Sequence, residues 1–213
     1  MVALDSTREL LVDAALAEFA EKGFVGTSRQ MIGARAKVGM VVVEHYFKSR
    51  EEIASAIIDR MKAHTDPIGR IDFSKLGSAA AWQMAVRQFL TRFVDTFRNE
   101  ETECRYFAAL YRHEYNTPAL KQRTLWAICL VPLRDTLRQL VAMGLRDATA
   151  TELHLWTMSI WTNLIAYCFS TPQRRDDSLP EGLSIQELNK LVVDFLCSNL
   201  FRGLDAKRRD SAS

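Results

Sequence analysis

The chain has 213 residues, of which 48% are hydrophobic and 25% are charged, and its formal net charge at pH 7 is +2. This apolar content is enough for a sizeable core, in one domain or in a small head on a larger body. The near balance of charge excludes a protein that attracts polyanions over its whole surface. No uncharged apolar run of about 18 residues is present, so no membrane span is predicted. The N-terminus carries Asp5 and Glu9 and no apolar run, which predicts a cytoplasmic protein without a signal peptide.

The sequence lacks the motifs of a metal site, a cofactor site or a common catalytic centre. There is no G-x-S-x-G, P-loop or dinucleotide fingerprint, and the histidines lack the spacing of metal ligands, so we expect neither an enzyme nor a bound cofactor or metal. The four cysteines are widely spaced within helical apolar patterns, without a C-x-x-C pair. Buried reduced thiols are therefore expected at Cys104, Cys129, Cys168 and Cys197.

A first helix is predicted from the capping box at residues 6–9, where Ser6 precedes Glu9 by three positions. Its apolar stripe is Leu11, Ala15 and Phe19, and Gly23 is expected to end it.

Residues 27–47 predict a helix-turn-helix. Thr27 and Ser28 can cap a short helix, and Gln30 completes a possible capping box with Thr27. A turn is expected at 36–39, followed by a second short helix. Two short helices joined by a tight turn are typical of a unit whose second helix lies in the DNA major groove.

The rest of the chain also predicts helices, which gives an all-α fold. Ser49 and Glu52 would open a helix with an apolar stripe at Ile53, Ile57 and Met61, and 65–77 would be a loop. Further helices are predicted on both sides of a polar loop at 171–183, with an interior proline, Pro132, that would kink one of them. The expected domains are a three-helix head at 1–50, a larger helical ligand-binding and dimerisation body at 51–204, and a charged, disordered tail at 205–213.

The segment around the helix-turn-helix resembles the TetR family of bacterial transcription regulators. The family's pattern, T-x-x-x-I-A-x-x-A-G-V-S-x-G-x-x-Y-x-H-F-x-x-K-x-x-L, is matched at Thr27 or Ser28, Ile32, Ala36, Val38, His45, Tyr46, Phe47, Arg50 and Ile53. The preceding Glu21-Lys22-Gly23-Phe24 also resembles the family. Four landmarks differ, because Lys37, Gly39, Val41 and Glu44 stand where the family has Gly, Ser, Gly and Tyr.

The resemblance implies a ligand-responsive regulator, a repressor, that binds operator DNA as a homodimer. Residues 27–50 hold five bases and one acid, a net charge of +4, where phosphate attraction would need it, although an ordinary solvated basic face would look the same. Glu44 could accept from a cytosine amino group or could repel phosphate. The expected DNA-contacting residues are Thr27, Ser28, Arg29, Lys37, Met40, Glu44, His45, Tyr46, Lys48 and Arg50.

The resemblance further implies a small apolar or amphipathic effector within the body and pairing of the last two helices with those of a second subunit. Surface at Leu155, Trp161, Leu196 and Phe201 is expected at that interface, since both helices are apolar on more than one face. The apolar run 40–43 leaves an alternative open, a TetR-fold module that binds a ligand or a protein and whose head binds DNA weakly or not at all. The expected ligand-binding residues are Trp82, Phe89, Phe93, Phe107, Tyr111, Trp126, Trp156, Asn163 and Tyr167.

Overall fold

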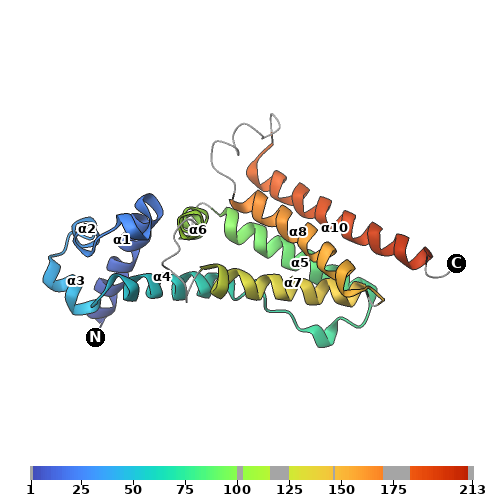
Figure 1. Cartoon of the computed structure of the whole chain (residues 1–213), viewed down its shortest axis with the longest axis horizontal. Coiled ribbons are helices and arrows are strands. Elements are labelled where there is room, and N and C mark those ends of the chain that lie inside the picture. Colours follow the sequence, from blue (N-terminus) through green and yellow to red (C-terminus); the bar gives the residue numbers. More distant parts are fainter. Residues whose placement is uncertain (1, 100–102, 116–124, 146, 170–182, 211–213) are drawn as a thin grey trace. The chain divides into compact units, whose positions relative to one another are not determined.

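The computed structural model describes residues 2–99, 103–115, 125–145, 147–169 and 183–210, and every regular element in these ranges is helical (Figure 1). The all-α prediction is thereby confirmed. The chain divides into two compact units, one made of 1–64 and 100–130 and the other of 65–99 and 131–213. The domain boundaries predicted after residues 50 and 204 remain a prediction.

Unit 1 is built on the long helix α1, which packs against both α2 and α6, while α2 packs against α3. Arg60 of α4 joins this arrangement through ion pairs with Glu9 and Asp13 of α1 and with Glu103 of η2. The elements of the unit are α1 (Val2–Gly26), α2 (Arg29–Arg35), α3 (Met40–Tyr46), α4 (Arg50–Thr65), η2 (Glu103–Tyr106), α6 (Phe107–Tyr115) and a π-helical turn η3 (Trp126–Leu130).

The core of unit 1 follows the predicted apolar stripes. The side chains that form it on α1 and α4 are buried, namely Leu11, Ala15, Phe19, Ile53, Ile57 and Met61. In contrast, α1 begins at Val2, so the predicted start at the 6–9 capping box is wrong. Gly23 does interrupt the helix, because its φ of 73° lies in the left-handed region that a residue without a β-carbon adopts readily.

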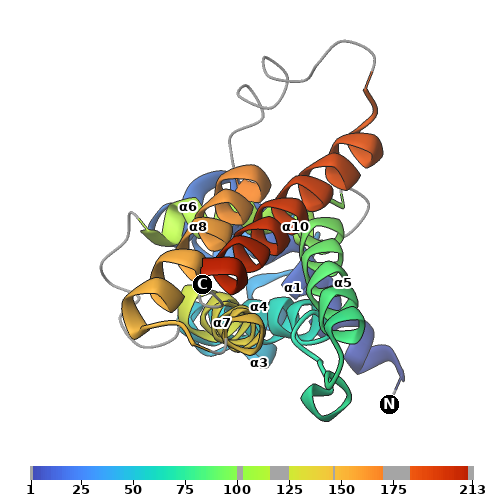
Figure 2. The same cartoon turned by 90° about the vertical axis from the view of Figure 1, so that its right-hand side faces the viewer.

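Unit 2 is organised around α5, which contacts α7, α8 and α10 (Figure 2). One face of α5 is buried, including Val86, Phe89 and Phe93, and near its start the indole Nε1 of Trp82 donates to the carbonyl of Leu140 at 2.7 Å. The elements are η1 (Phe73–Lys75), α5 (Ala79–Arg98), α7 (Val131–Gly144), α8 (Ala150–Phe169) and α10 (Ile185–Asp210), whose last turns pass the predicted start of the tail.

Helix boundaries in this unit follow local chemistry. Thr149 and Glu152 form a capping box at the start of α8, since the Thr149 N–H donates to the Glu152 carboxylate at 2.7 Å and the Glu152 N–H donates to the Thr149 hydroxyl at 3.2 Å. Ser184 and Glu187 do the same for α10. Pro132 lies at the start of α7, directly after the π-helical turn 126–130. A wider turn at that point accommodates a proline, which has no N–H to donate.

Two further expectations meet the structure here. The four cysteines are buried and unbridged, as predicted, and burial raises the pKa of the Cys197 thiol to about 11.

Of the residues expected at a subunit interface, Trp161 and Leu196 instead belong to the core of unit 2, and Phe201 packs its ring against Trp82 at 5.4 Å. Leu155 is exposed.

Among the helices that the structure describes, none combines the length and the apolar character needed to cross a lipid bilayer. The polar loop expected at 171–183 lies outside the described residues except for Leu183.

Candidate nucleic-acid interface

The helix-turn-helix forms from α2, a turn at 36–39 and α3. The turn is closed by backbone hydrogen bonds, including one from Val38 N–H to the Gly33 carbonyl at 2.9 Å. Lys37 has a φ of 57°, the left-handed conformation for which the TetR pattern uses glycine at this position. The replaced landmark therefore keeps the backbone shape and adds a cationic side chain to the turn.

The hydroxyls at 27 and 28 have different roles. Ser28 is the N-cap of α2, and its Oγ accepts from the Met31 N–H at 3.2 Å. Thr27 is only 1% exposed, and its hydroxyl lies 2.9 Å from the Gly23 carbonyl and 3.2 Å from the Glu18 carbonyl. Thr27 thus stabilises the corner between α1 and α2 and offers no surface to DNA, in contrast to the expectation from the sequence.

Arg29 connects α2 to the end of α3. Its Nη1 donates to the carbonyl of Lys48 at 2.9 Å and to that of Phe47 at 3.3 Å, and its Nη2 lies 3.6 Å from the carboxylate of Glu44. The neighbouring guanidinium therefore partly neutralises the charge of Glu44. The carbonyls of Phe47 and Lys48, which follow α3, also gain a hydrogen-bond donor that α3 itself cannot supply. In this arrangement Arg29 holds the end of α3 in place.

Arg50 has the same role at the other corner. Its Nη1 donates to the Thr27 carbonyl at 3.0 Å and makes longer contacts with the carbonyls of Phe24 and Val25, and its guanidinium lies over the Phe24 ring at 5.1 Å. Arg29 and Arg50, which were expected to bind phosphates, thus both donate hydrogen bonds to backbone carbonyls.

A buried acid fixes α2 on α1. The carboxylate of Glu18 accepts from Lys22 Nζ and from Arg35 Nε, each at 2.7 Å, while Arg35 also pairs with Glu21 at 2.5 Å. The hydrogen bond from Lys22, followed by the contribution of Arg35, lowers the pKa of Glu18 despite its burial. Arg35 is consequently committed to holding the two helices together.

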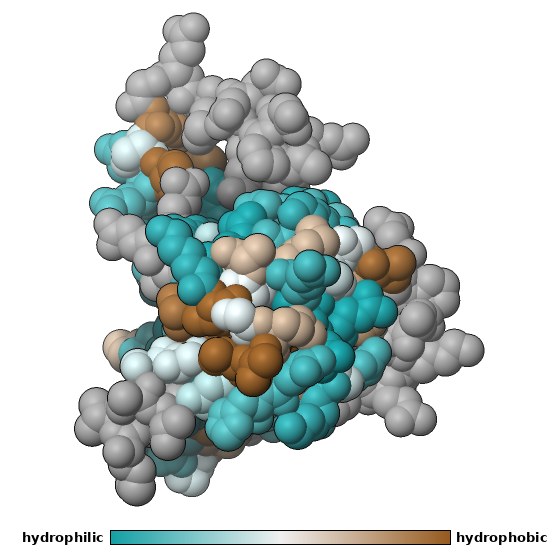
Figure 3. All heavy atoms as spheres, turned by 90° about the vertical axis from the view of Figure 1, so that its left-hand side faces the viewer, coloured by the Kyte–Doolittle hydropathy of each residue, from teal (hydrophilic) through white to brown (hydrophobic). Residues whose placement is uncertain are grey.

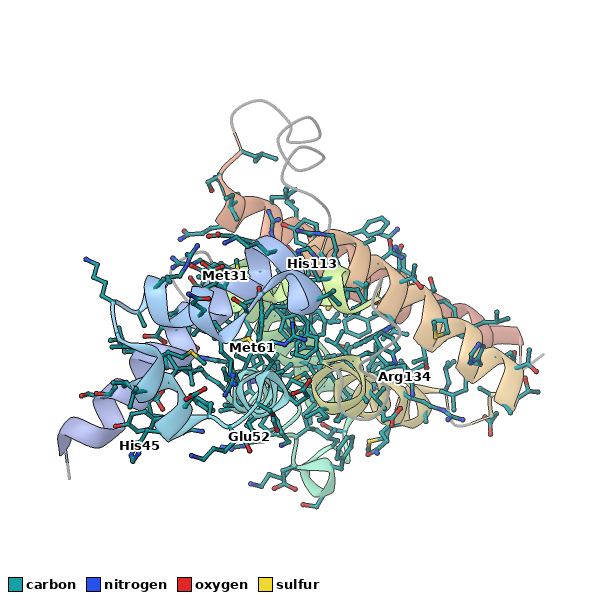
Figure 4. The ribbon with its side chains drawn as sticks, turned by 60° about the vertical axis from the view of Figure 1, so that its left-hand side comes forward. Met31, His45, Glu52, Met61, His113 and Arg134 are labelled. Atoms are coloured by element: carbon teal, nitrogen blue, oxygen red, sulfur yellow. The ribbon has the colours of Figure 1, made fainter. Side chains whose placement is uncertain are left out.

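The outer face of α3 carries the remaining candidates. Val41 is 82% exposed, Glu44 and His45 are exposed, and Met40 and Tyr46 are partly exposed. His45 and Tyr46 meet edge to face at 5.0 Å, and His45 projects outward from α3 in Figure 4. Figure 3 views the side on which α2 and α3 lie and shows apolar patches among hydrophilic surface.

Two exposed lysines lie beside α3, Lys37 in the turn before it and Lys48 after its end. The Nζ of Lys48 donates to the Glu44 carbonyl at 2.9 Å. An ammonium group has three donors on a flexible stem, so one such contact leaves Lys48 able to reach a phosphate as well.

The expected ligand-binding residues are divided between the two units. Phe107, Tyr111 and Trp126 belong to unit 1, and the others belong to unit 2. Asn163 is exposed, and its Nδ2 donates to the Ser159 carbonyl one turn earlier in the same helix at 2.7 Å, which removes it from an interior site. Trp156 covers Gly203 of α10, where an added β-carbon would overlap its indole ring. The remaining aromatic residues expected at the site are buried or half-buried, each in its own unit.

Unit 1 contains a small apolar cavity of about 50 Å³ that the sequence did not predict. His113 lines one side of the cavity (Figure 4). Its Nε2 lies 3.2 Å from the Ala20 carbonyl, and because a carbonyl oxygen can only accept, this nitrogen carries the proton. Among the described residues, no three His, Cys, Asp or Glu side chains gather as a metal site would require. The cavity is lined by Phe19, Phe24, Ala54, Ile57, Ile58, Leu110, His113 and Leu125.

Comparison with known proteins agrees with the helix-turn-helix assignment. Residues 11–57 match the family model described as bacterial regulatory proteins, tetR family, which confirms the resemblance noted in the sequence. No curated protein sequence matches the chain.

Solved structures extend the likeness to the fold of nearly the whole chain. A TetR-like transcriptional regulator from Rhodococcus sp. RHA1 is 21% identical with a TM-score of 0.62, over 93% of this chain and 96% of that one. The fatty acid degradation regulator FadR from Bacillus halodurans is 17% identical with a TM-score of 0.63, over 90% and 94%. The regulator PfmR from Thermus thermophilus is 18% identical with a TM-score of 0.63, over 88% and 97%.

Proposed function

We propose that this chain, which has the fold of TetR-family transcription regulators and the family's sequence in residues 11–57, is a repressor that binds operator DNA as a homodimer and responds to a small effector. The observation that carries the proposal is the outer face of α3, where Met40, Glu44, His45 and Tyr46 lie between the exposed Lys37 and Lys48. A short helix of this kind fits the major groove.

The contacts expected on DNA divide into two kinds. Lys37, Lys48, Ser28 and His45 would bind phosphate oxygens and fix the register, without reading sequence. Met40 and the exposed Val41 are suited to contact thymine methyl groups, which lie in the major groove. Because Thr27 is buried and both Arg29 and Arg50 hold backbone carbonyls, the phosphate contacts fall mainly to the lysines.

The test of DNA binding uses the two lysines. Replacing Lys37 and Lys48 with Ala should weaken binding to all duplexes and flatten the salt dependence by about one phosphate for each lysine. The matched control is Lys75→Ala, since Lys75 is an exposed lysine of unit 2. Equal binding by the wild type and the double variant in a low-salt gel shift would overturn the DNA function.

Glu44 is the residue that can add sequence preference. Its carboxylate lies 3.6 Å from Arg29, and it is exposed on the α3 face, where it could accept from a cytosine amino group. If it reads cytosine, Glu44→Ala should relax the preference at one base pair in a selection from random duplexes. If it only repels phosphate, the same change should tighten binding to every sequence.

The homodimer is supported by apolar side chains left exposed on α8 and α10. Phe195 is 61% exposed, Leu191 and Leu155 are exposed, and Leu191 and Phe195 stand four residues apart on one face of α10. Large apolar side chains exposed on one helix face, as Leu191 and Phe195 are, indicate an interaction site. A second copy with the same surface would cover it about a two-fold axis and would place two heads on two operator half-sites.

The second candidate function is a module that binds a ligand or a protein without tight DNA binding. It is favoured by one observation, the 82% exposed Val41 in the first turn of α3. In that case the α3 face would be a protein-binding surface. A selection from random duplexes that enriches no sequence, together with no salt-dependent binding, would favour this function over the repressor.

A further inference from the structure

Arg98, in the last turn of α5, is an unusual buried cation. Its side chain belongs to unit 2, and the residue is only 7% exposed. Its Nε and Nη1 atoms are buried and have no hydrogen-bond acceptor in the part of the chain that the structure describes. A buried charge without acceptors is among the least favourable arrangements in a folded protein, because it has lost its water and gained nothing in exchange.

The contacts that Arg98 does make compensate it only in part. Its guanidinium lies over the ring of Tyr167 of α8 at 4.8 Å, a favourable cation–π distance. Its place at the C-terminal end of α5 also favours a positive charge. Neither contact supplies an acceptor oxygen for the two buried nitrogens.

The carboxylates of Asp95 on α5 and Asp194 on α10 do not compensate the charge of Arg98. The pKa of Asp95, three residues earlier on α5, is raised by burial, which an adjacent guanidinium would oppose. On the same helix, Arg87 forms an ion pair with Asp194 of α10. Within the described residues, Arg87 of α5 has a carboxylate partner and Arg92 donates to the Arg70 carbonyl, whereas the buried Arg98 keeps two donors without an acceptor.

We propose that Arg98 binds the carboxylate of the effector, which is a small amphipathic organic monoanion. This inference rests on the effector-responsive function proposed above and gives the effector a chemical class. The helices that carry Arg98 and Tyr167 also supply aromatic side chains for an apolar remainder, because Phe97 of α5 meets Phe169 of α8 edge to face at 5.1 Å, and Phe93 meets Trp161 at 5.6 Å. A single guanidinium neutralises one negative charge, which matches a carboxylate better than a phosphate dianion.

Tyr167 is the second residue of the site. Its ring covers the guanidinium, and its hydroxyl lies 2.6 Å from Oδ1 of Asn189 on α10. An anion at Arg98 would therefore be joined to α8 and α10 through one aromatic ring. Those two helices are the ones that carry the proposed dimer surface.

The experiment compares the full-length wild type with Arg98→Met and Arg98→Lys, and uses Arg138→Gln, an exposed arginine of the same unit, as the matched control. The probes are octanoate and benzoate, their neutral counterparts 1-octanol and benzyl alcohol, and inorganic phosphate. The affinity, by calorimetry, and the melting temperature are measured for each protein with each probe. Gel shifts with the selected operator, with and without each probe, run in parallel.

We expect a carboxylate to bind the wild type and raise its melting temperature, and its affinity to fall about tenfold or more in Arg98→Met, as the loss of a charged hydrogen bond implies. The affinity of the neutral alcohols should not change, and Arg98→Lys should keep part of the carboxylate binding. Without any ligand, Arg98→Met should melt at a higher temperature than the wild type, because the unpaired charge is gone.

Two results would overturn the inference. One is a ligand-free Arg98→Met that melts well below the wild type while Arg138→Gln does not, which would show that Arg98 is already paired within the protein. The other is the absence of Arg98-dependent carboxylate binding in the wild type, including preference for phosphate alone. Carboxylate binding without DNA binding would reject the repressor function and keep this inference. DNA binding without carboxylate binding would reject this inference and keep DNA binding as the function.

Discussion

A β-carbon placed on Gly33 would lie 2.9 Å from Cγ2 of Val43. These residues face each other where α2 crosses α3, and the same β-carbon would lie 3.1 Å from the Val38 carbonyl. Val43 is fully buried, so its side chain has little room to move away. The absence of a side chain at position 33 therefore sets how closely the two helices of the helix-turn-helix approach.

Gly33→Ala should destabilise the protein by about 1–3 kcal/mol, the usual cost of overpacking a tight contact. Chemical denaturation of both proteins measures the difference. The paired substitution is Gly39→Ser at the N-cap of α3, which has no side-chain cap and no atom near an added β-carbon. It should be neutral or stabilising by up to about 1 kcal/mol, since serine is a better cap. Equal effects of both changes would refute the steric account.

Arg50→Ala should lower stability by about 1–3 kcal/mol, because the Thr27 carbonyl loses a charged donor and the Phe24 ring loses its cation. Lys37→Ala, at an exposed turn position, should leave the melting temperature almost unchanged. Thermal melts separate a structural arginine from a lysine that acts on DNA alone. An unchanged melting temperature for Arg50→Ala would return that residue to the phosphate-binding group.

The ion pairs of Glu18 make the head sensitive to acid. Because the pKa of Glu18 is lowered in the folded state, the stability it adds is fully present above the ordinary glutamate pKa and is lost as pH falls through the lowered value. Glu18→Gln should therefore be less stable than the wild type at pH 7, and the gap should narrow as pH falls below about 4. Urea denaturation from pH 7 to pH 3 tests this, and a gap that stays constant with pH would contradict it.

The dimer prediction depends on two adjacent residues of α10. Phe195 is largely exposed, whereas Leu196 is 3% exposed in the core. Leu191→Glu combined with Phe195→Glu should give a monomer with unchanged helix content and weakened operator binding. Leu196→Glu should instead unfold the protein, because it buries an unpaired carboxylate. Sedimentation and circular dichroism distinguish these outcomes, and a wild type that sediments as a monomer at micromolar concentration would reject the dimer.

Much of the fold was predictable because it depends on local patterns. The apolar period places Leu11, Phe19, Ile57 and Phe93 in the core, and the capping box at Thr149 and Glu152 locates a helix start. The start of α1 at Val2 was missed, since a capping box inside a longer helix competes poorly with continued helix formation.

The candidate site was less predictable, because residue type does not reveal whether a polar side chain faces solvent or backbone. Thr27, Arg29 and Arg50 are the types that bind phosphate, yet each one bonds to carbonyls that only the folded corners bring near. Arg98 is absent from the residues expected at the site, although the sequence carries a signal for it. It continues the four-residue spacing of Leu90 and Val94, so a charged residue stood in an apolar row.

The order of segments in unit 1 has a consequence for protein engineering. The chain leaves this unit after residue 64, returns at 100 and leaves again after 130, so α1, on which the helix-turn-helix packs, also packs against α6. A chimeric regulator made by joining residues 1–64 to a foreign effector module would expose the side of α1 against which α6 packs. The transferable cassette is therefore discontinuous, and a working graft must bring residues 100–130 along with the N-terminal segment.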